Sequence, residues 1–474
     1  MMILFLIILP LLTSLMLFAI RSGHTGKTIA TIVSSILFFV SIFGGYEVWT
    51  MPQNGLTTSI NLQQQLGIML DFKMDGISIL FVLLTTLLVP IIVASTYREE
   101  QRPSSFYALI LLMQSSLIGV FTASNLLLFY IFWEFTLLPI FFITARWGGK
   151  NAKKISIKFL IYTIVGSFFM LVAILYLYTQ TPAPHSFNFA DIYQLHLSYS
   201  AQLLVFLAFA LAFAIKIPLF PFHSWQPETY NASPVQGSML LAGLMLKMGL
   251  YGIIRFLIPL AQQVIFNSST IVLSIIIIGV LYGGVIAVTQ PNLKKMIAFA
   301  SLAHVALIAA GLFSNNIYGI EGGILQSFSH GVNIVGFFLC YAIIVKRTHT
   351  DSISQLGGIA RQAPRFGIVF MIIMLANIAL PLTNSFVGEF LILLGLFSVN
   401  KVIAVLAGLT IIIGAVYMLR MYQKVMYGAS QTATEHFADL SWSEMLLFTP
   451  IILTIFLIGV YPSFVLTMLQ NVVH

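Results

Sequence analysis

The stretch LAFALAFAIKIPLF, residues 207–220, combines a long apolar run with one lysine and one proline. With its neighbours it forms an apolar segment over 201–222, which is long enough to cross about 30 Å of hydrocarbon as a helix. No water is available there, so the backbone groups must pair within the segment, as they do in a helix. The stretch therefore predicts a membrane-spanning helix that carries a buried charge, Lys216, beside a break at Pro218.

Segments of this kind recur along the whole chain. Of its 474 residues, 59% are hydrophobic and only 8% are charged, whereas a soluble domain carries about a quarter charged residues. We therefore predict an all-α, polytopic membrane protein of about fourteen transmembrane helices, the first of them a span and not a removable signal peptide. The spans are expected at roughly 2–20, 28–47, 75–96, 105–122, 124–145, 156–179, 201–222, 234–258, 268–289, 295–313, 318–345, 366–397, 400–426 and 444–469.

The basic residues indicate how these helices are oriented. With this set of spans, most of the 22 lysines and arginines fall in loops on one side, and only Lys73, Arg255 and Lys401 fall on the other. Because basic loops face the cytoplasm, both termini are expected outside it. Orientation then accounts for the net charge of +8, and no nucleic-acid partner is expected.

The segments between spans are too short to form a nucleotide-binding or catalytic domain. Residues 48–74 alternate enough to predict an external strand or hairpin. The single cysteine, Cys340, cannot form an internal disulfide, an iron–sulfur site or a zinc site by itself. We therefore expect neither cofactor nor metal in this chain.

Two predicted spans are interrupted by proline, which removes a backbone donor and frees carbonyl groups. Pro218 and Pro221 follow Lys216, and Pro381 lies inside 366–397. Paired interrupted helices, here five spans apart, favour two inverted five-helix repeats with one discontinuous helix each. Two unrelated proline kinks are the alternative. The expected divisions are three helices and a hairpin at 1–100, one repeat at 105–260, the inverted repeat at 265–427 and a last helix at 440–474.

Four charged residues stand out well inside predicted spans: Glu134, Lys216, Lys247 and Glu389. Each costs about 2.5–3.5 kcal/mol on insertion scales, so each is a candidate functional residue. A static ion pair between helices is one alternative. The other is a switch, because a buried lysine beside a movable glutamate holds a proton in one arrangement and releases it in another. We predict a route for protons or other small cations along these four side chains.

Histidines inside or beside spans are candidate proton relays, because their charge changes near neutral pH. His223, His304 and His330 are of this kind, although for each alone helix packing is the more common explanation. Haem ligation is not expected. It needs paired histidines on facing helices, and each predicted span here carries at most one.

Several longer motifs resemble the antiporter-like, proton-pumping membrane subunits of respiratory complex I. They are FHSWQPETYNASPVQGSMLLAGLMLKMGLYGIIRF (222–256), FYIFWEFTLLPIFFI (129–143), DGISILF (75–81), NLKKMIAFASLAHVALI (292–308), SHGVNIVGFFLC (329–340) and LGGIARQAPRF (356–366). The resemblance runs nearly end to end. Glu389 distinguishes among these subunits. The neighbouring chains L and N of that complex generally carry lysine at this position, so the chain resembles the remaining type of antiporter-like subunit more than either of them. The chain also ends shortly after Leu469, without the long lateral helix expected of chain L.

This resemblance implies roles for the candidate residues. Glu134 would pair with Lys216 in a half-channel from the cytoplasm, Lys247 would be the connecting lysine, and Glu389 would be the terminal proton carrier. His304 and His330 match positions between them. Asn292 departs from the family, which often has aspartate there, but it lies in a loop away from the expected route.

The resemblance also implies partners. Electron transfer from NADH to quinone would take place in partner subunits that hold FMN, iron–sulfur clusters and quinone. Chains L and N would be the neighbours, in a bacterial cytoplasmic (inner) membrane. Two alternatives remain. A subunit of a multisubunit cation/proton antiporter shares most of the motifs, and a structural spacer subunit of a membrane-bound hydrogenase-like complex is the other.

Overall fold

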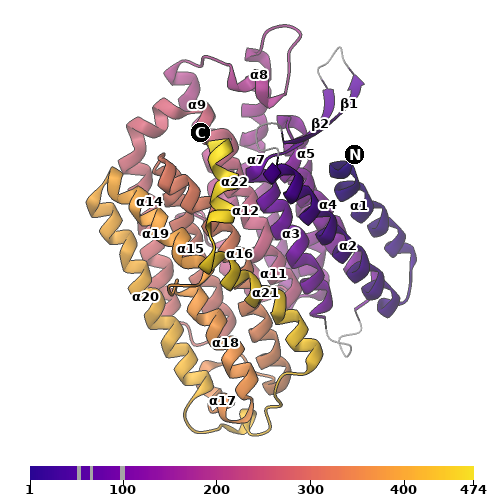
Figure 1. Cartoon of the computed structure of the whole chain (residues 1–474), viewed down its shortest axis with the longest axis vertical. Coiled ribbons are helices and arrows are strands. Elements are labelled where there is room, and N and C mark those ends of the chain that lie inside the picture. The colour runs from indigo at the N-terminus through magenta and orange to yellow at the C-terminus, as the bar shows by residue number, and fades with distance from the viewer. Residues whose placement is uncertain (51–54, 64–67, 97–101, 474) are drawn as a thin grey trace. The chain divides into compact units, whose positions relative to one another are not determined.

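The computed structural model describes residues 1–50, 55–63, 68–96 and 102–473, and most of them are helical (Figure 1). The contacts divide the chain into two units. The first comprises Met1–Ile217, Ala232–Ser269 and Thr467–His474, and the second comprises Pro218–Asn231 and Thr270–Leu466. The two units are described in turn.

The first unit contains a helical bundle and one hairpin. Its helices α3 and α4 lie inside, packed against each other, with α1 and α2 against them and α7 against α9. The elements are α1 Met2–Ala19, α2 Gly23–Thr50, β1 Leu56–Gln63, β2 Ile68–Met74, α3 Gly76–Ala94, α4 Ser104–Thr122, α5 Leu126–Phe135, α6 Leu137–Trp147, α7 Ala152–Gln180, α8 Phe189–Tyr193, α9 Tyr199–Lys216, α11 Val235–Leu240, η3 Leu241–Met245, α12 Leu246–Gly252, η4 Ile253–Leu257 and α13 Ile258–Leu260.

The hairpin confirms the strand pattern expected within 48–74. Strands β1 and β2 are antiparallel, with Leu56 opposite Met74 and Ile60 opposite Leu70 (Figure 1). Asp75 follows β2 directly and caps α3, because its carboxylate accepts hydrogen bonds from the backbone N–H groups of Ile77 and Ser78. The hairpin therefore runs straight into the next span.

The second unit is a bundle around α15 and α16. Helix α16 packs along α19 and α15, while α20 and α21 lie against α19. The elements are α10 Trp225–Ala232, α14 Gln262–Thr289, α15 Leu293–Phe313, α16 Ile317–Thr348, η5 Ile353–Gln355, α17 Ile359–Gln362, α18 Pro364–Asn377, α19 Asn384–Val399, α20 Lys401–Met426, η6 Thr432–Thr434, α21 Trp442–Val460 and α22 Ser463–Val473. The last residue of α10, the first turns of α14 and the end of α22 are counted with the first unit.

The number of spans agrees with the sequence. Among the described residues, thirteen helical segments are long and apolar enough to cross a membrane, and two shorter apolar helices, α18 and α19, together occupy the remaining predicted span, 366–397. Exposed side chains on the outer helices are mainly apolar, such as Phe39 on α2, Ile161 on α7 and Val402 on α20. An apolar exterior of this extent is the surface that a helix presents to lipid.

Two spans end earlier in the structure than the sequence predicted. The span expected at 201–222 ends at Lys216, two residues before Pro218, which has no backbone N–H to continue the helix. The last span, expected at 444–469, ends at Val460, and a separate helix starts at Ser463 after Pro462. Proline explains both differences, since it disfavours helical geometry in the residue before it.

Candidate functional site

Glu134 lies on α5, which begins at Asn125. The Asn125 side chain accepts hydrogen bonds from the backbone N–H groups of Leu127 and Leu128 at 2.8 and 3.1 Å and so fixes the start of the helix. Tyr130, one turn before Glu134, interacts electrostatically with its carboxylate. Oxygen Oε1 of Glu134 is buried and has no hydrogen-bond partner among the described residues. The carboxylate is therefore able to accept a further donor.

Lys216 is the last residue of α9, and its side chain is buried. Its Nζ lies 3.5 Å from Thr136 Oγ1 and 4.9 Å from the centre of the Trp133 ring. Glu134 is within electrostatic range of this ammonium group. In the described part of the chain, however, no salt bridge within 4.0 Å joins them. The structure thus brings the two predicted partners near each other, Lys216 at the end of α9 and Glu134 in the last turn of α5.

Lys247 occupies an unusual helical segment. It lies on α12, between the two π-helical segments η3 and η4, and its side chain is fully buried. Its Nζ donates a hydrogen bond to the carbonyl oxygen of Ala242, which lies in η3, at 2.6 Å. A π-helical turn lengthens the backbone hydrogen-bond spacing and is frequent at functional sites. The irregular backbone therefore supplies a polar contact for a lysine in an apolar helix that packs against α9.

Glu389 lies on α19 in the second unit and is buried. Its Oε1 accepts a hydrogen bond from Gln326 Nε2 on α16 at 3.0 Å and lies 3.0 Å from His304 Nδ1 on α15. On the other side of the imidazole ring, His304 Nε2 lies 3.3 Å from the hydroxyl of Tyr417 on α20. Four helices thus contribute to one polar cluster around the predicted terminal acid.

The break before α19 shapes this cluster. Residues Ala379 and Leu382 have positive φ, at 55° and 73°, where α18 has ended and α19 has not begun. Asn333 on α16 donates hydrogen bonds to the carbonyl oxygen of Ala376 at 3.2 Å and to Asn384 Oδ1 at 3.0 Å. Side chains therefore compensate the backbone groups that the break exposes, as an interrupted membrane helix requires.

A close approach of α16 and α19 sets the position of Glu389. A Cβ atom on Gly388 would lie 2.8 Å from Gln326 Cβ and 2.9 Å from its backbone nitrogen. Only glycine fits this contact without displacing α16. Gly388 therefore allows the Gln326 amide to reach the neighbouring Glu389 carboxylate.

The three predicted histidines fall into different surroundings. His304 contacts Glu389 directly, and His330 Nε2 lies 3.2 Å from Ser301 Oγ, with its ring centre 6.2 Å from that of His304. His223 packs against two aromatic rings instead: its ring centre lies 5.6 Å from that of Phe220 and 4.8 Å from that of Tyr282. The structure thus joins His304 and His330 and leaves His223 apart from them.

Sequence reasoning missed several residues of these clusters. Gln326 and Tyr417 contact the predicted acid and its histidine, and Thr136 contacts Lys216. The sequence could have indicated them only as polar residues within apolar spans. Neutral polar residues are too common in such spans to identify a site. Sequence reasoning also missed Glu321, a buried acid on α16, and the ion pair of Arg255 with Asp75.

A polytopic helical bundle with buried acids, lysines and histidines is typical of an ion-translocating membrane protein. The family described as NADH:quinone oxidoreductase/Mrp antiporter, TM, matches residues 123–414, and the chain belongs to it. The resemblance seen in the sequence is thereby confirmed.

Individual relatives agree with this assignment. The chain is 39% identical to NADH-quinone oxidoreductase subunit M of Rickettsia conorii (strain ATCC VR-613 / Malish 7), over 97% of this chain and 95% of that one. It superposes on a chain of respiratory complex I from Thermus thermophilus with a TM-score of 0.91, 30% identity and coverage of 99% and 98%. A chain of the Mrp complex from Dietzia sp. DQ12-45-1b has the same fold, with a TM-score of 0.86, 17% identity and coverage of 99% and 96%.

Proposed function

We propose that this chain moves protons across the membrane as the M-type subunit of an NADH:quinone oxidoreductase, coupled to electron transfer from NADH to quinone in partner subunits. The observation that carries the proposal is the buried contact of Glu389 with His304, 3.0 Å apart and shared by two membrane helices. A buried acid beside an imidazole ring can exchange a proton without a metal or a redox centre.

Glu134 and Lys216 support a second proton-binding position in the other unit. They influence each other electrostatically without a direct salt bridge in the described structure, so a small movement of either side chain would open or close an ion pair. Such a pair can bind a proton in one arrangement and release it in the other. We propose that Glu134 and Lys216 take up protons, that Lys247 transfers them and that Glu389 releases them, with His330 and His223 as additional relays.

The proposal extends to the two repeats, the orientation in the membrane and the partner subunits. Each five-helix repeat, 105–260 and 265–427, would carry one half of the route, the second inverted relative to the first. The basic loops would face the cytoplasm of a bacterium, with both termini on the opposite side of its inner membrane. FMN, iron–sulfur clusters and quinone would be held by partner subunits, with chains L and N beside this chain and no redox centre within it.

A cation/proton antiporter subunit is the alternative, because the family description and the shared fold include the Mrp antiporter. The identity of Glu389 favours the oxidoreductase, since the resemblance assigns lysine to this position in the antiporter subunits. A spacer subunit of a hydrogenase-like complex is a third candidate. It predicts that neutralising the buried charges alters assembly but not proton movement.

The test uses the assembled complex in inverted membrane vesicles, with NADH oxidation and proton uptake measured together. The variants Lys216→Met and Glu134→Gln should assemble but translocate fewer protons per NADH. Lys401→Met is the matched control, because Lys401 is an exposed lysine at the start of α20. Normal proton translocation in both Lys216→Met and Glu134→Gln would overturn the assigned roles.

A further inference from the structure

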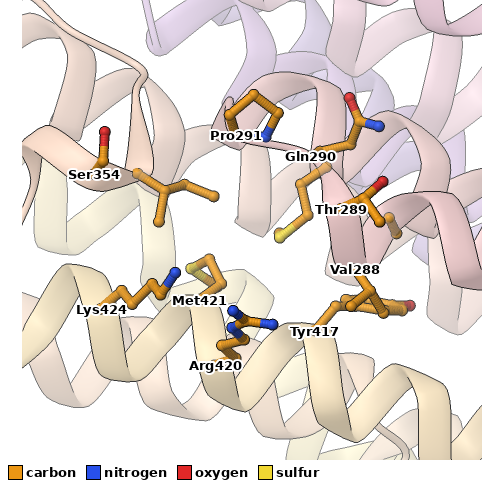
Figure 2. Close-up of a pocket in the computed structure, with 12 residues that line it drawn as sticks. Val288, Thr289, Gln290, Pro291, Ser354, Tyr417, Arg420, Met421 and Lys424 are labelled. Carbon is orange, nitrogen blue, oxygen red and sulfur yellow. The ribbon is translucent and has the colours of Figure 1, made fainter.

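A pocket of about 450 Å³ lies among the ends of helices in the second unit. Figure 2 shows Tyr417, Arg420, Met421 and Lys424 along one helix, opposite Thr289, Gln290 and Pro291. Thr289, Pro291, Ser354, Arg420 and Lys424 are exposed, and Tyr417 is buried. The pocket therefore has an open, polar mouth and is bordered by the buried residue Tyr417.

Tyr417 is also the first member of a hydrogen-bonded chain that ends at Glu389. Its hydroxyl lies 3.3 Å from His304 Nε2, and His304 Nδ1 lies 3.0 Å from Glu389 Oε1. All three side chains are buried. A tyrosine hydroxyl both donates and accepts, and an imidazole ring has two nitrogens, so each member can receive a proton on one side and pass one on at the other.

We propose that this pocket is a second proton-access site, from which Tyr417 and His304 deliver protons to Glu389. The inference rests on the proposed function, in which Glu389 carries the proton, and it adds an access route that does not pass through Lys216. The pocket lies at one end of the unit, and its lining residues Pro291 and Ser354 are close in sequence to Lys294, Lys295 and Lys346. By the distribution of basic residues that end faces the cytoplasm.

Each proton is accounted for when one proton moves from the pocket to Glu389. A water molecule in the pocket gives a proton to the Tyr417 oxygen while the Tyr417 hydroxyl proton moves to His304 Nε2, so that tyrosine stays neutral. His304, now protonated on both nitrogens, releases the Nδ1 proton to the Glu389 carboxylate. Glu389 ends as the neutral acid, and the pocket water takes a replacement proton from the aqueous phase.

The lining of the pocket suits water. Gln290, Thr289 and Ser354 offer hydrogen-bonding groups, and a pocket of this volume holds several water molecules. Arg420 and Lys424 make the mouth unfavourable for hydrated Na⁺ or K⁺. A proton that passes by exchange along hydrogen bonds need not enter the buried part as a hydrated cation.

The simplest test replaces Tyr417 in the assembled complex. Tyr417→Phe removes the hydroxyl and should lower the protons translocated per NADH by at least about twofold, because the relay loses its only link between pocket and His304 in the described structure. Tyr422→Phe is the matched control: it lies on the same helix and is also buried, but its hydroxyl donates to the Gly367 carbonyl. An unchanged ratio in Tyr417→Phe would overturn the inference.

A second measurement tests whether protons enter through the pocket or whether Tyr417 only holds the His304 ring in place. It can also be made if the Tyr417→Phe complex does not assemble. Thr289→Cys places a thiol at the mouth of the pocket, and a positively charged, membrane-impermeant methanethiosulfonate reagent converts it to a mixed disulfide. Labelling should lower proton translocation relative to the identically labelled parent complex, and a thiol reductant should restore it. Cys340, the native cysteine of this chain, is buried.

Ser443→Cys is the control for labelling, because Ser443 is exposed at the start of α21 and does not line the pocket. Its modification should leave the ratio of protons to NADH as before. If blocking the pocket has no effect while Glu389→Gln still lowers proton translocation per NADH, the access site is wrong and the proposed function stands. If Glu389→Gln also has no effect, the proposed function itself fails.

Discussion

His304 Nδ1 lies 3.0 Å from Glu389 Oε1, and the two residues come from α15 and α19. The contact is buried, with about 6% and 3% of the two side chains exposed. An ionised carboxylate at this depth requires compensation, which His304 and the Gln326 amide provide. Protonation of Glu389 removes that requirement, so the cluster can hold the acid in either state.

The packing of α16 on α19 should control this site. Gly388→Ala introduces a Cβ atom into the Gln326 contact, where the available distances are below 3.0 Å. We expect α16 to shift and proton translocation per NADH to fall, with less assembled complex in the membrane. The measurement is complex abundance by native electrophoresis, together with the proton-to-NADH ratio.

Gly408→Ala is the control for this substitution, because no atom lies within 4 Å of the position that its Cβ would occupy. It should leave abundance and proton translocation unchanged. Equal behaviour of the two alanine variants would show that the glycine contact does not matter.

The ion pair of Arg347 with Glu444 should stabilise the second unit without serving proton transfer. Glu444 Oε2 lies 2.7 Å from Arg347 Nη2 and also accepts from the backbone N–H of Ser441, the cap of α21. Glu444→Gln should therefore cost roughly 1–3 kcal/mol in stability. Thermal unfolding of the purified complex would reveal the loss. A lowered proton-to-NADH ratio in the surviving complex would contradict this separation of roles.

Sequence patterns predicted the span number, the hairpin and both helix breaks, because long apolar runs and prolines act locally. They did not place the π-helical turns around Lys247, which depend on packing between helices. The four charges were visible because each is costly in an apolar span. Gln326 and Tyr417 were not, because a neutral polar residue becomes significant only through the partner that it meets.

Asp75 and Arg255 offer a test by pH, since Asp75 lies just outside α3. Burial acts to raise the pKa of Asp75, but the Arg255 guanidinium and the Ser78 N–H overcome this and hold that pKa below its usual value. A carboxyl group with a lowered pKa in the folded state adds stability above its unfolded pKa, about 3.9, and loses it as the pH falls through the folded pKa.

Asp75→Asn keeps a capping side chain but removes the charge. We expect faster hydrogen exchange in the first turns of α3 in the variant, by the same factor from pH 5 to pH 8 once intrinsic rates are corrected. The difference should shrink only below about pH 4. A difference that changes between pH 5 and pH 8 would contradict the assigned ion pair.

The central claim is that Glu389 carries protons across the membrane. The most direct measurement is the number of protons translocated per NADH oxidised by the assembled complex with Glu389→Gln, which keeps the size of the side chain but cannot ionise. We predict normal assembly, continued NADH oxidation and a ratio reduced to less than about half. A parental ratio in a complex of normal abundance would contradict the account.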